Sequence, residues 1–155
     1  MSLLLFLVVI ATVVNGMLAG ANLEGSLVKL PTRRRIGVVS YATFARGNDL
    51  GNGRVIYPIW AQSASLLTLL VTVVAYVERQ PLFLLLPLSI ASLLSLGRYY
   101  VTSKAAPVML SLKNTPDDEA ILRAKLDTFE RWSAVRTTFM GLIFFTLMWA
   151  LLVAH

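Results

Sequence analysis

The sequence predicts an all-α protein, a bundle of four transmembrane helices with both termini outside and two basic loops in the cytoplasm. Of the 155 residues, 57% are hydrophobic and only 14% are charged, which excludes a soluble globular domain. Almost all Lys and Arg residues fall in or beside two polar stretches, 24–54 and 98–136, and apolar runs separate these stretches. The chain, 1–155, has the length of one compact integral membrane domain without a second one.

Four apolar runs meet the physical requirement for crossing a bilayer. A hydrocarbon core about 30 Å thick needs roughly 17 to 25 apolar helical residues, whose backbone groups all pair within the helix. The spans are predicted at 3–23, 55–77, 81–97 and 137–154. No positive charge precedes Lys29, so we expect the first run to be a retained helix rather than a cleaved signal peptide.

The distribution of basic residues predicts the orientation. Lys and Arg favour the cytoplasmic side, so both polar stretches should face the cytoplasm and both termini should lie outside. The remaining connection, 78–80, is long enough only for a hairpin turn. These features predict a multi-pass protein of the plasma (inner) membrane, whose basic loops contact anionic lipids.

In the first span, Gly16 and Gly20 lie one helical turn apart and would let another backbone approach closely. Asn15 lies beside this stripe, and two interpretations stay open for it. The amide either hydrogen-bonds a neighbouring helix or lines an internal pocket, since a polar group in the bilayer is costly without a partner. In the third span, a polar stripe at intervals of three is typical of helix packing: Ser89, Ser92 and Ser95.

The polar stretches predict further helical segments. Residues 33–46 combine arginines with apolar residues at helical spacing, which predicts a helix at the membrane surface. Residues 47–53 are rich in Gly and Asn and predict a turn or compact loop. Thr115 as the N-cap and Pro116 at the first helical position predict a helix over 115–136 that continues into the fourth span.

Trp132 and Arg136 lie four residues apart, hence on one face of this helix. One interpretation is an interfacial tryptophan with an arginine that extends toward the lipid headgroups. The other is that Arg136 points into the bundle and binds an anion or a carbonyl group, because an arginine entering a span commonly marks a site.

Several kinds of chemistry are excluded by composition. The chain has no cysteine, its only histidine is His155, and the predicted spans contain no carboxylates. We therefore expect no metal and no cofactor. Anionic lipid accounts for the net charge of +6, so a nucleic-acid partner is not expected. The loop carboxylates that remain for acid–base work are Glu24, Asp49 and Glu130.

Three features of the chain carry a family resemblance: the Trp132-x-x-x-Arg136 motif, the Asn114 region upstream of it and the Gly16-x-x-x-Gly20 stripe. With these features the chain resembles the anthrone-oxygenase-like family of small four-span proteins. Many members of that family are classed only as a domain of unknown function. The resemblance covers nearly the whole chain and rests on the span pattern, the loop lengths and the Trp-x-x-x-Arg motif. It implies oxidation of polycyclic anthrones to anthraquinones by molecular oxygen, without a conventional cofactor. It also implies that Trp132 and Arg136 line the site, with Asn15 and Asn114 as polar partners.

Three functions follow in order of preference. The first is a monomeric or homo-oligomeric bundle with a pocket near the cytoplasmic interface for a lipophilic aromatic or quinone-like molecule. The second is a non-enzymatic accessory subunit that packs against a larger membrane complex. The third is a glutathione-transferase-like membrane enzyme, because Arg54-Val55-Ile56-Tyr57 is similar to a segment of the microsomal glutathione transferase superfamily. Convergence of Asn15, Trp132 and Arg136 on a cavity would favour the first function.

Overall fold

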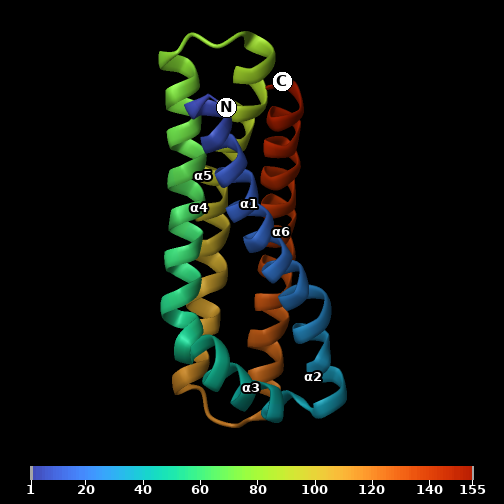
Figure 1. The fold of residues 1–155 in the computed structure, drawn as a ribbon. Helices are drawn as coiled ribbons and strands as arrows, with labels where there is room; N and C mark the ends of the chain where they lie inside the picture. The colour runs from blue at the N-terminus through green and yellow to red at the C-terminus, as the bar shows by residue number, and fades with distance from the viewer. Residues whose placement is uncertain (1, 155) are drawn as a thin grey trace.

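The computed structural model describes residues 2–154 and confirms the all-α fold class. Four long helical rods form an elongated bundle (Figure 1). The elements are α1 (Leu3–Glu24), a π-helical turn η1 (Gly25–Lys29), α2 (Leu30–Ile36), α3 (Val38–Gly47), a second π-helical turn η2 (Asn48–Asn52), α4 (Gly53–Val77), α5 (Leu82–Ser111), a 3₁₀ turn η3 (Leu112–Asn114) and α6 (Glu119–Val153).

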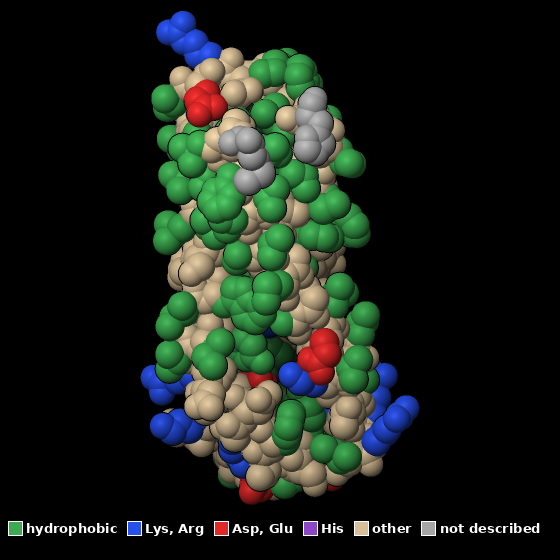
Figure 2. Space-filling view, in the orientation of Figure 1, with side chains coloured by type: hydrophobic (Ala, Val, Ile, Leu, Met, Phe, Trp, Pro, Cys, Tyr) green, Lys and Arg blue, Asp and Glu red, His purple; other side chains and the backbone are tan. Residues whose placement is uncertain are grey.

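Each rod is long and apolar enough to cross a membrane. The four rods are Leu3–Ile36, Val38–Val77, Leu82–Asn114 and Glu119–Val153. Large apolar side chains cover the outside of the bundle, among them Leu93, Phe145 and Leu152, as expected for a surface that faces lipid (Figure 2). The chain is therefore a small multi-pass integral membrane protein.

Neighbouring long helices run in opposite directions (Figure 1). In this bundle α1 and α5 each pack between α4 and α6. Polar side chains link neighbours inside this arrangement. Asn15 of α1 donates from Nδ2 to the carbonyl oxygen of Ala64 (3.3 Å) and to Oγ1 of Thr68 (3.1 Å) in α4. Thr72 of α4 hydrogen-bonds Ser92 of α5, with 2.8 Å between their hydroxyl oxygens. Such bonds between transmembrane helices each contribute about 0.6 to 2 kcal/mol.

Both polar stretches lie at one end of the bundle, which we call the basic end. Figure 1 shows α2, α3 and the turn between α5 and α6 there, whereas both termini and the turn between α4 and α5 lie at the other end. Lys and Arg side chains gather at the basic end in Figure 2. The basic loops therefore share one side, as the prediction of four spans requires.

The protein has two main apolar cores, one at each end. The terminal core joins all four long helices and contains Leu4, Val8, Ala11, Val71, Ala75, Leu84, Leu88, Ala91, Ile143, Leu147 and Ala150. The basic core joins α2, α3, α5 and α6 and contains Leu30, Val38, Tyr41, Ala42, Ala45, Ala105, Met109, Leu112, Leu122, Leu126 and Phe129. The helices thus continue to pack well beyond the predicted spans.

The predicted surface helix over 33–46 is wrong in one respect, because Gly37 divides it. Gly37 has a φ of 88°, which disfavours any residue with a side chain, and it separates α2 from α3. The predicted loop 47–53 is largely the π-helical turn η2, with a non-helical kink at Gly51. The chain can therefore turn across the basic end while keeping most of its backbone groups paired.

The predicted start of the last helix at Thr115 is also wrong. The helix begins at Glu119, and Asp118 is its N-cap, whose carboxylate accepts a hydrogen bond from the backbone N–H of Ile121 (2.9 Å). Thr115 instead donates its hydroxyl to the carbonyl oxygen of Ser111 (2.7 Å) at the end of α5. From Glu119 onward α6 runs without a break to Val153, which confirms the predicted continuous rod.

Two arginines fasten the α2–α3 segment to the rest of the basic end. Arg33 is only 6% exposed and pairs with Asp127 (2.7 Å) and Glu130 of α6. Arg46 donates to the carbonyl oxygens of Leu112 (3.0 Å) and Thr115 (2.7 Å). It also pairs with the carboxylate of Asp117 at 2.7 Å.

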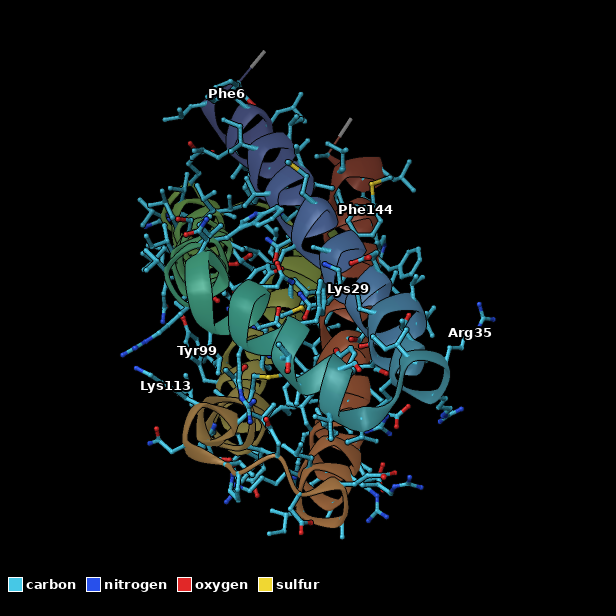
Figure 3. All side chains as sticks on the ribbon, turned by 90° about the horizontal axis from the view of Figure 1, so that it is seen from below. Phe6, Lys29, Arg35, Tyr99, Lys113 and Phe144 are labelled. Atoms are coloured by element: carbon cyan, nitrogen blue, oxygen red, sulfur yellow. The ribbon has the colours of Figure 1, made fainter. Side chains whose placement is uncertain are left out.

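We predict that Arg33→Ala lowers the free energy of unfolding by about 1 to 3 kcal/mol, because Asp127 loses its partner and Glu130 keeps only the exposed Arg34. Arg35→Ala is the matched control, since Arg35 lies in the same helix, is exposed and points away from the bundle (Figure 3). Thermal unfolding of the detergent-solubilised protein would measure both changes. Equal effects of the two substitutions would contradict the role given to Arg33.

Candidate functional site

A cavity of about 460 Å³ lies between the predicted spans and the basic core. Figure 2 shows this face hollowed toward the basic end, with acidic and basic side chains beside the hollow. Its volume falls in the range of about 300 to 1,000 Å³ that is typical of small-molecule sites. The lining residues come from α1, η1, α2, α3, η2, α4, α5 and α6.

Both π-helical turns border this cavity. Gly25 and Lys29 of η1, and Asp49 and Leu50 of η2, are lining residues. A π-helical turn inserts an extra residue into a helix and is frequent at functional sites, because it changes where the following side chains point. Figure 3, viewed from the basic end, shows Lys29 between helices near the middle of the bundle. Its ammonium group pairs with Glu24 at 3.0 Å.

Most of the wall is apolar or aromatic. The aliphatic and sulfur-containing side chains include Leu18, Leu30, Met109 and Met140, and the aromatic ones are Tyr41, Tyr57, Tyr99 and Phe129. The Tyr99 hydroxyl donates to the side-chain oxygen of Gln62, another lining residue. A wall of this kind favours a lipophilic ligand with a flat apolar body.

Four cationic side chains line the cavity, those of Lys29, Arg54, Arg98 and Arg136. Among the described residues a single carboxylate lines it, that of Asp49. Arg98 is 2% exposed. It donates from Nη2 to the carbonyl oxygen of Ala61 (2.8 Å) and to the hydroxyl of Ser65 in α4. Arg98 therefore links α5 to α4 through uncharged acceptors.

Arg136 differs from Arg98 in having an unpaired buried nitrogen. Its Nε is buried and has no hydrogen-bond partner within residues 2–154. The guanidinium carbon lies 5.8 Å from the centre of the Phe129 ring, a cation–π distance. One turn before it, Ser133 hydrogen-bonds Ser26 of η1 (3.2 Å) and also lines the cavity. Arg136 thus provides a positive charge beside the cavity, and it forms no ion pair within 4.0 Å among residues 2–154.

The structure brings only one of the four predicted ligand-binding residues to the cavity. Arg136 lines it, whereas Asn15 lies in the α1–α4 interface, as the first of its two interpretations expects. Trp132 packs against the basic core, and Asn114 is exposed in η3. Asn15, Trp132 and Arg136 therefore do not converge on one cavity.

The residues predicted for helix packing have different surroundings in the structure. A Cβ added to Gly16 would lie 2.8 Å from Phe144 of α6, so Gly16 permits close packing, whereas Gly20 has no such neighbour within 4 Å. Ser92 bonds Thr72, and Ser89 bonds the Tyr76 hydroxyl (3.0 Å). Ser95 is buried, and its hydroxyl has no partner among the described residues.

Sequence reasoning missed several lining residues, and one of them had a usable signal. Arg98 continues the interval of three that runs through Ser89, Ser92 and Ser95, so the stripe itself indicated an inward-facing arginine. Asp49 was already among the loop carboxylates named for acid–base work, whereas Lys29 had no comparable signal, because its position depends on the π-helical turn η1.

The described residues contain no group of three or more His, Cys, Asp or Glu side chains that could hold a metal ion. Comparison with known proteins matches the chain to no family model, no curated protein and no solved structure. The cavity is therefore the feature of this protein that bears on its function.

We predict that the buried Arg98 and the half-buried Arg136 respond oppositely to substitution by Met, which matches an arginine side chain as far as Nε and has no charge. Arg98→Met should lower the free energy of unfolding by about 1 to 3 kcal/mol, since two acceptors in α4 lose their donor. Arg136→Met should leave it unchanged or raise it, because the substitution removes a charged group whose buried Nε has no hydrogen-bond partner among the described residues. Thermal unfolding after thorough detergent exchange would measure both. A similar loss of unfolding free energy in the two variants would contradict the different roles given to Arg98 and Arg136.

Proposed function

We propose that this protein binds a lipophilic aromatic or quinone-like molecule in the cavity. The observation that carries the proposal is the cavity's composition, an apolar and aromatic wall with the unpaired Nε of Arg136 beside it. Binding sites for small molecules usually have this character, a mostly apolar surface with a few polar groups that orient the ligand.

The position of the cavity supports a ligand that arrives from the membrane. The cavity crosses the boundary of the predicted spans: Leu18, Ala61 and Met140 lie inside the spans, and Phe129 lies beyond them toward the basic end. We place the basic end in the cytoplasm, since Lys and Arg are retained there, and we place the protein in the plasma (inner) membrane. An amphipathic molecule concentrates at this depth, with its polar part near the headgroups.

Oxygenase-like chemistry is the more specific part of this proposal, and it rests on the resemblance to the anthrone-oxygenase-like family. An anthrone would lose a proton to give an enolate, which would react with O₂ and yield an anthraquinone and water. Arg136 would stabilise the enolate oxygen, and the Asp49 carboxylate in the same cavity would accept the proton. Trp132, Asn15 and Asn114 would then support the fold and would not contact the substrate.

Two other functions each have one observation in their favour. Gly20 is exposed and has no neighbour within 4 Å of an added Cβ, which suits an accessory subunit that packs a partner's helix, or another copy of this chain, against α1. Arg54 and Tyr57, both from the segment similar to membrane glutathione transferases, line the cavity, which suits a glutathione-transferase-like enzyme. Neither observation accounts for the apolar wall.

We predict that protein purified in mild detergent retains a lipophilic aromatic molecule, detected by native mass spectrometry and by its absorption spectrum. Ala61→Phe should abolish retention, because Ala61 lines the cavity and the larger side chain would fill it. Ala134→Phe is the control, since Ala134 is exposed on α6 and outside the cavity. Ligand-free protein that co-purifies with stoichiometric partner chains would favour the accessory-subunit function instead.

We predict that the basic charges determine the orientation. Arg34→Gln and Arg35→Gln, combined with two arginines inserted before Leu3, should reduce the fraction of molecules with external termini. These arginines are exposed, so the substitutions spare the buried Arg33 pairs. A C-terminal alkaline phosphatase fusion, active only outside, would report the change. Unaltered phosphatase activity would contradict the topology.

A further inference from the structure

We infer that the ligand of the cavity is an anion, a lipophilic molecule with one acidic oxygen group held by Arg136. This inference rests on the proposed function and adds the charge of the ligand to it. The acidic group could be a carboxylate, a phenolate, an enolate or a phosphate ester, all of which present anionic oxygens to a guanidinium.

The first argument is the imbalance of charge around the cavity. Of its four cations, Lys29 is paired with Glu24, and Arg54 is exposed to solvent at the rim. Arg98 donates to a carbonyl and a hydroxyl oxygen, neither of which carries a charge. Asp49 lines the cavity, but it is absent from the ion pairs formed within 4.0 Å among residues 2–154. Asp49 supplies one negative charge against the two positive charges of Arg98 and Arg136, so the inner wall keeps a net positive charge that a neutral ligand would leave uncompensated.

The second argument is the geometry of Arg136 itself. Burying a guanidinium nitrogen without a hydrogen bond is costly, and proteins normally satisfy buried polar groups. The unpaired Nε lies on the edge of the guanidinium that can form a two-point interaction with a carboxylate. The flanking Phe129 ring contributes a cation–π contact but accepts no such pair of bonds. An anionic oxygen group is the partner that this edge lacks.

The third argument concerns size. The cavity volume of about 460 Å³ suits a molecule of three fused rings with one acidic substituent. An anionic phospholipid offers the same oxygen chemistry, with its headgroup at the cavity and its chains outside. The volume and the aromatic wall favour the free amphiphile, and the experiment separates the two sources.

The test uses anthraquinone-2-carboxylic acid and its methyl ester, which share the ring system and differ in charge. Equilibrium dialysis against detergent-solubilised protein, with empty micelles as the blank, gives the two dissociation constants. We expect the wild type to bind the acid at least about tenfold more tightly than the ester, which corresponds to about 1.4 kcal/mol. Arg136→Met should abolish this preference while leaving the binding of the ester nearly unchanged.

Two further variants control for charge and folding. Arg35→Met removes an exposed arginine outside the cavity and should keep the full preference for the acid. Arg136→Lys retains the positive charge but loses the two-point geometry, and it should keep part of the preference. Ester binding by each variant shows that its cavity is formed.

The outcomes separate this inference from the proposed function. Equal binding of acid and ester by the wild type, abolished by Ala61→Phe, would overturn the anion inference and leave the proposed function standing. Binding of neither probe would count against both. A preference for the acid that survives Arg136→Met would remove Arg136 from the site and overturn the inference as stated.

The same titration in lipid nanodiscs identifies the source of the anion. If phosphatidylglycerol weakens binding of the acid relative to pure phosphatidylcholine, a lipid headgroup competes for the Arg136 site and the anion chemistry is supported with lipid as its source. Equal binding in the two lipids supports a free acidic amphiphile.

Discussion

The attachment of the α2–α3 segment by Arg33 and Arg46 is the interaction on which the basic end depends. Arg33 holds the end of the first rod to α6, and Arg46 holds α3 to the turn between α5 and α6. Both arginines are partly or fully shielded, so their bonds are stronger than those of exposed pairs. Leu30 and Tyr41 come from this segment, and Asp49 and Leu50 come from η2, which follows it directly, so the cavity has a wall at this end only while the segment is held.

The two ends of the bundle meet different physical demands. In the terminal core, buried small residues such as Ala11, Ala75 and Ala91 let the helices approach closely, which is how transmembrane helices gain van der Waals contact. Toward the basic end, the inward-facing guanidinium groups of Arg98 and Arg136 cannot be packed in the same way, because each needs polar partners. The cavity lies where these inward-facing arginines interrupt the close packing.

The sequence was sufficient for the fold class because the bilayer leaves few alternatives. Apolar runs such as 3–23 and 137–154 must be helical, since every backbone group in hydrocarbon needs a partner. The details of the basic end depend on tertiary contacts. Thr115 and Asp118 are both acceptable N-caps, and the choice of Asp118 leaves Thr115 free to bond the end of α5 and to accept a hydrogen bond from Lys125.

The candidate site was predictable only in part, for a related reason. Arg136 was identified because an arginine near a span is costly and therefore informative, but residues on the same helix need not share its surroundings. Trp132 lies four residues earlier and packs against the basic core, while Arg136 lines the cavity. The spacing of residues in a sequence predicts which of them share a face of a helix. It does not predict at which level of the bundle neighbouring helices leave a cavity, because that depends on the packing of all the helices.

Arg98 and Arg136 lie on adjacent helices, line the same cavity and differ in their partners. Arg98 donates to the carbonyl oxygen of Ala61 in α4 at 2.8 Å and to the hydroxyl of Ser65 in the same helix. No such acceptor is recorded near the Nε of Arg136 within residues 2–154. One arginine therefore contributes its hydrogen bonds to the fold, whereas the other lines the cavity with its Nε unpaired.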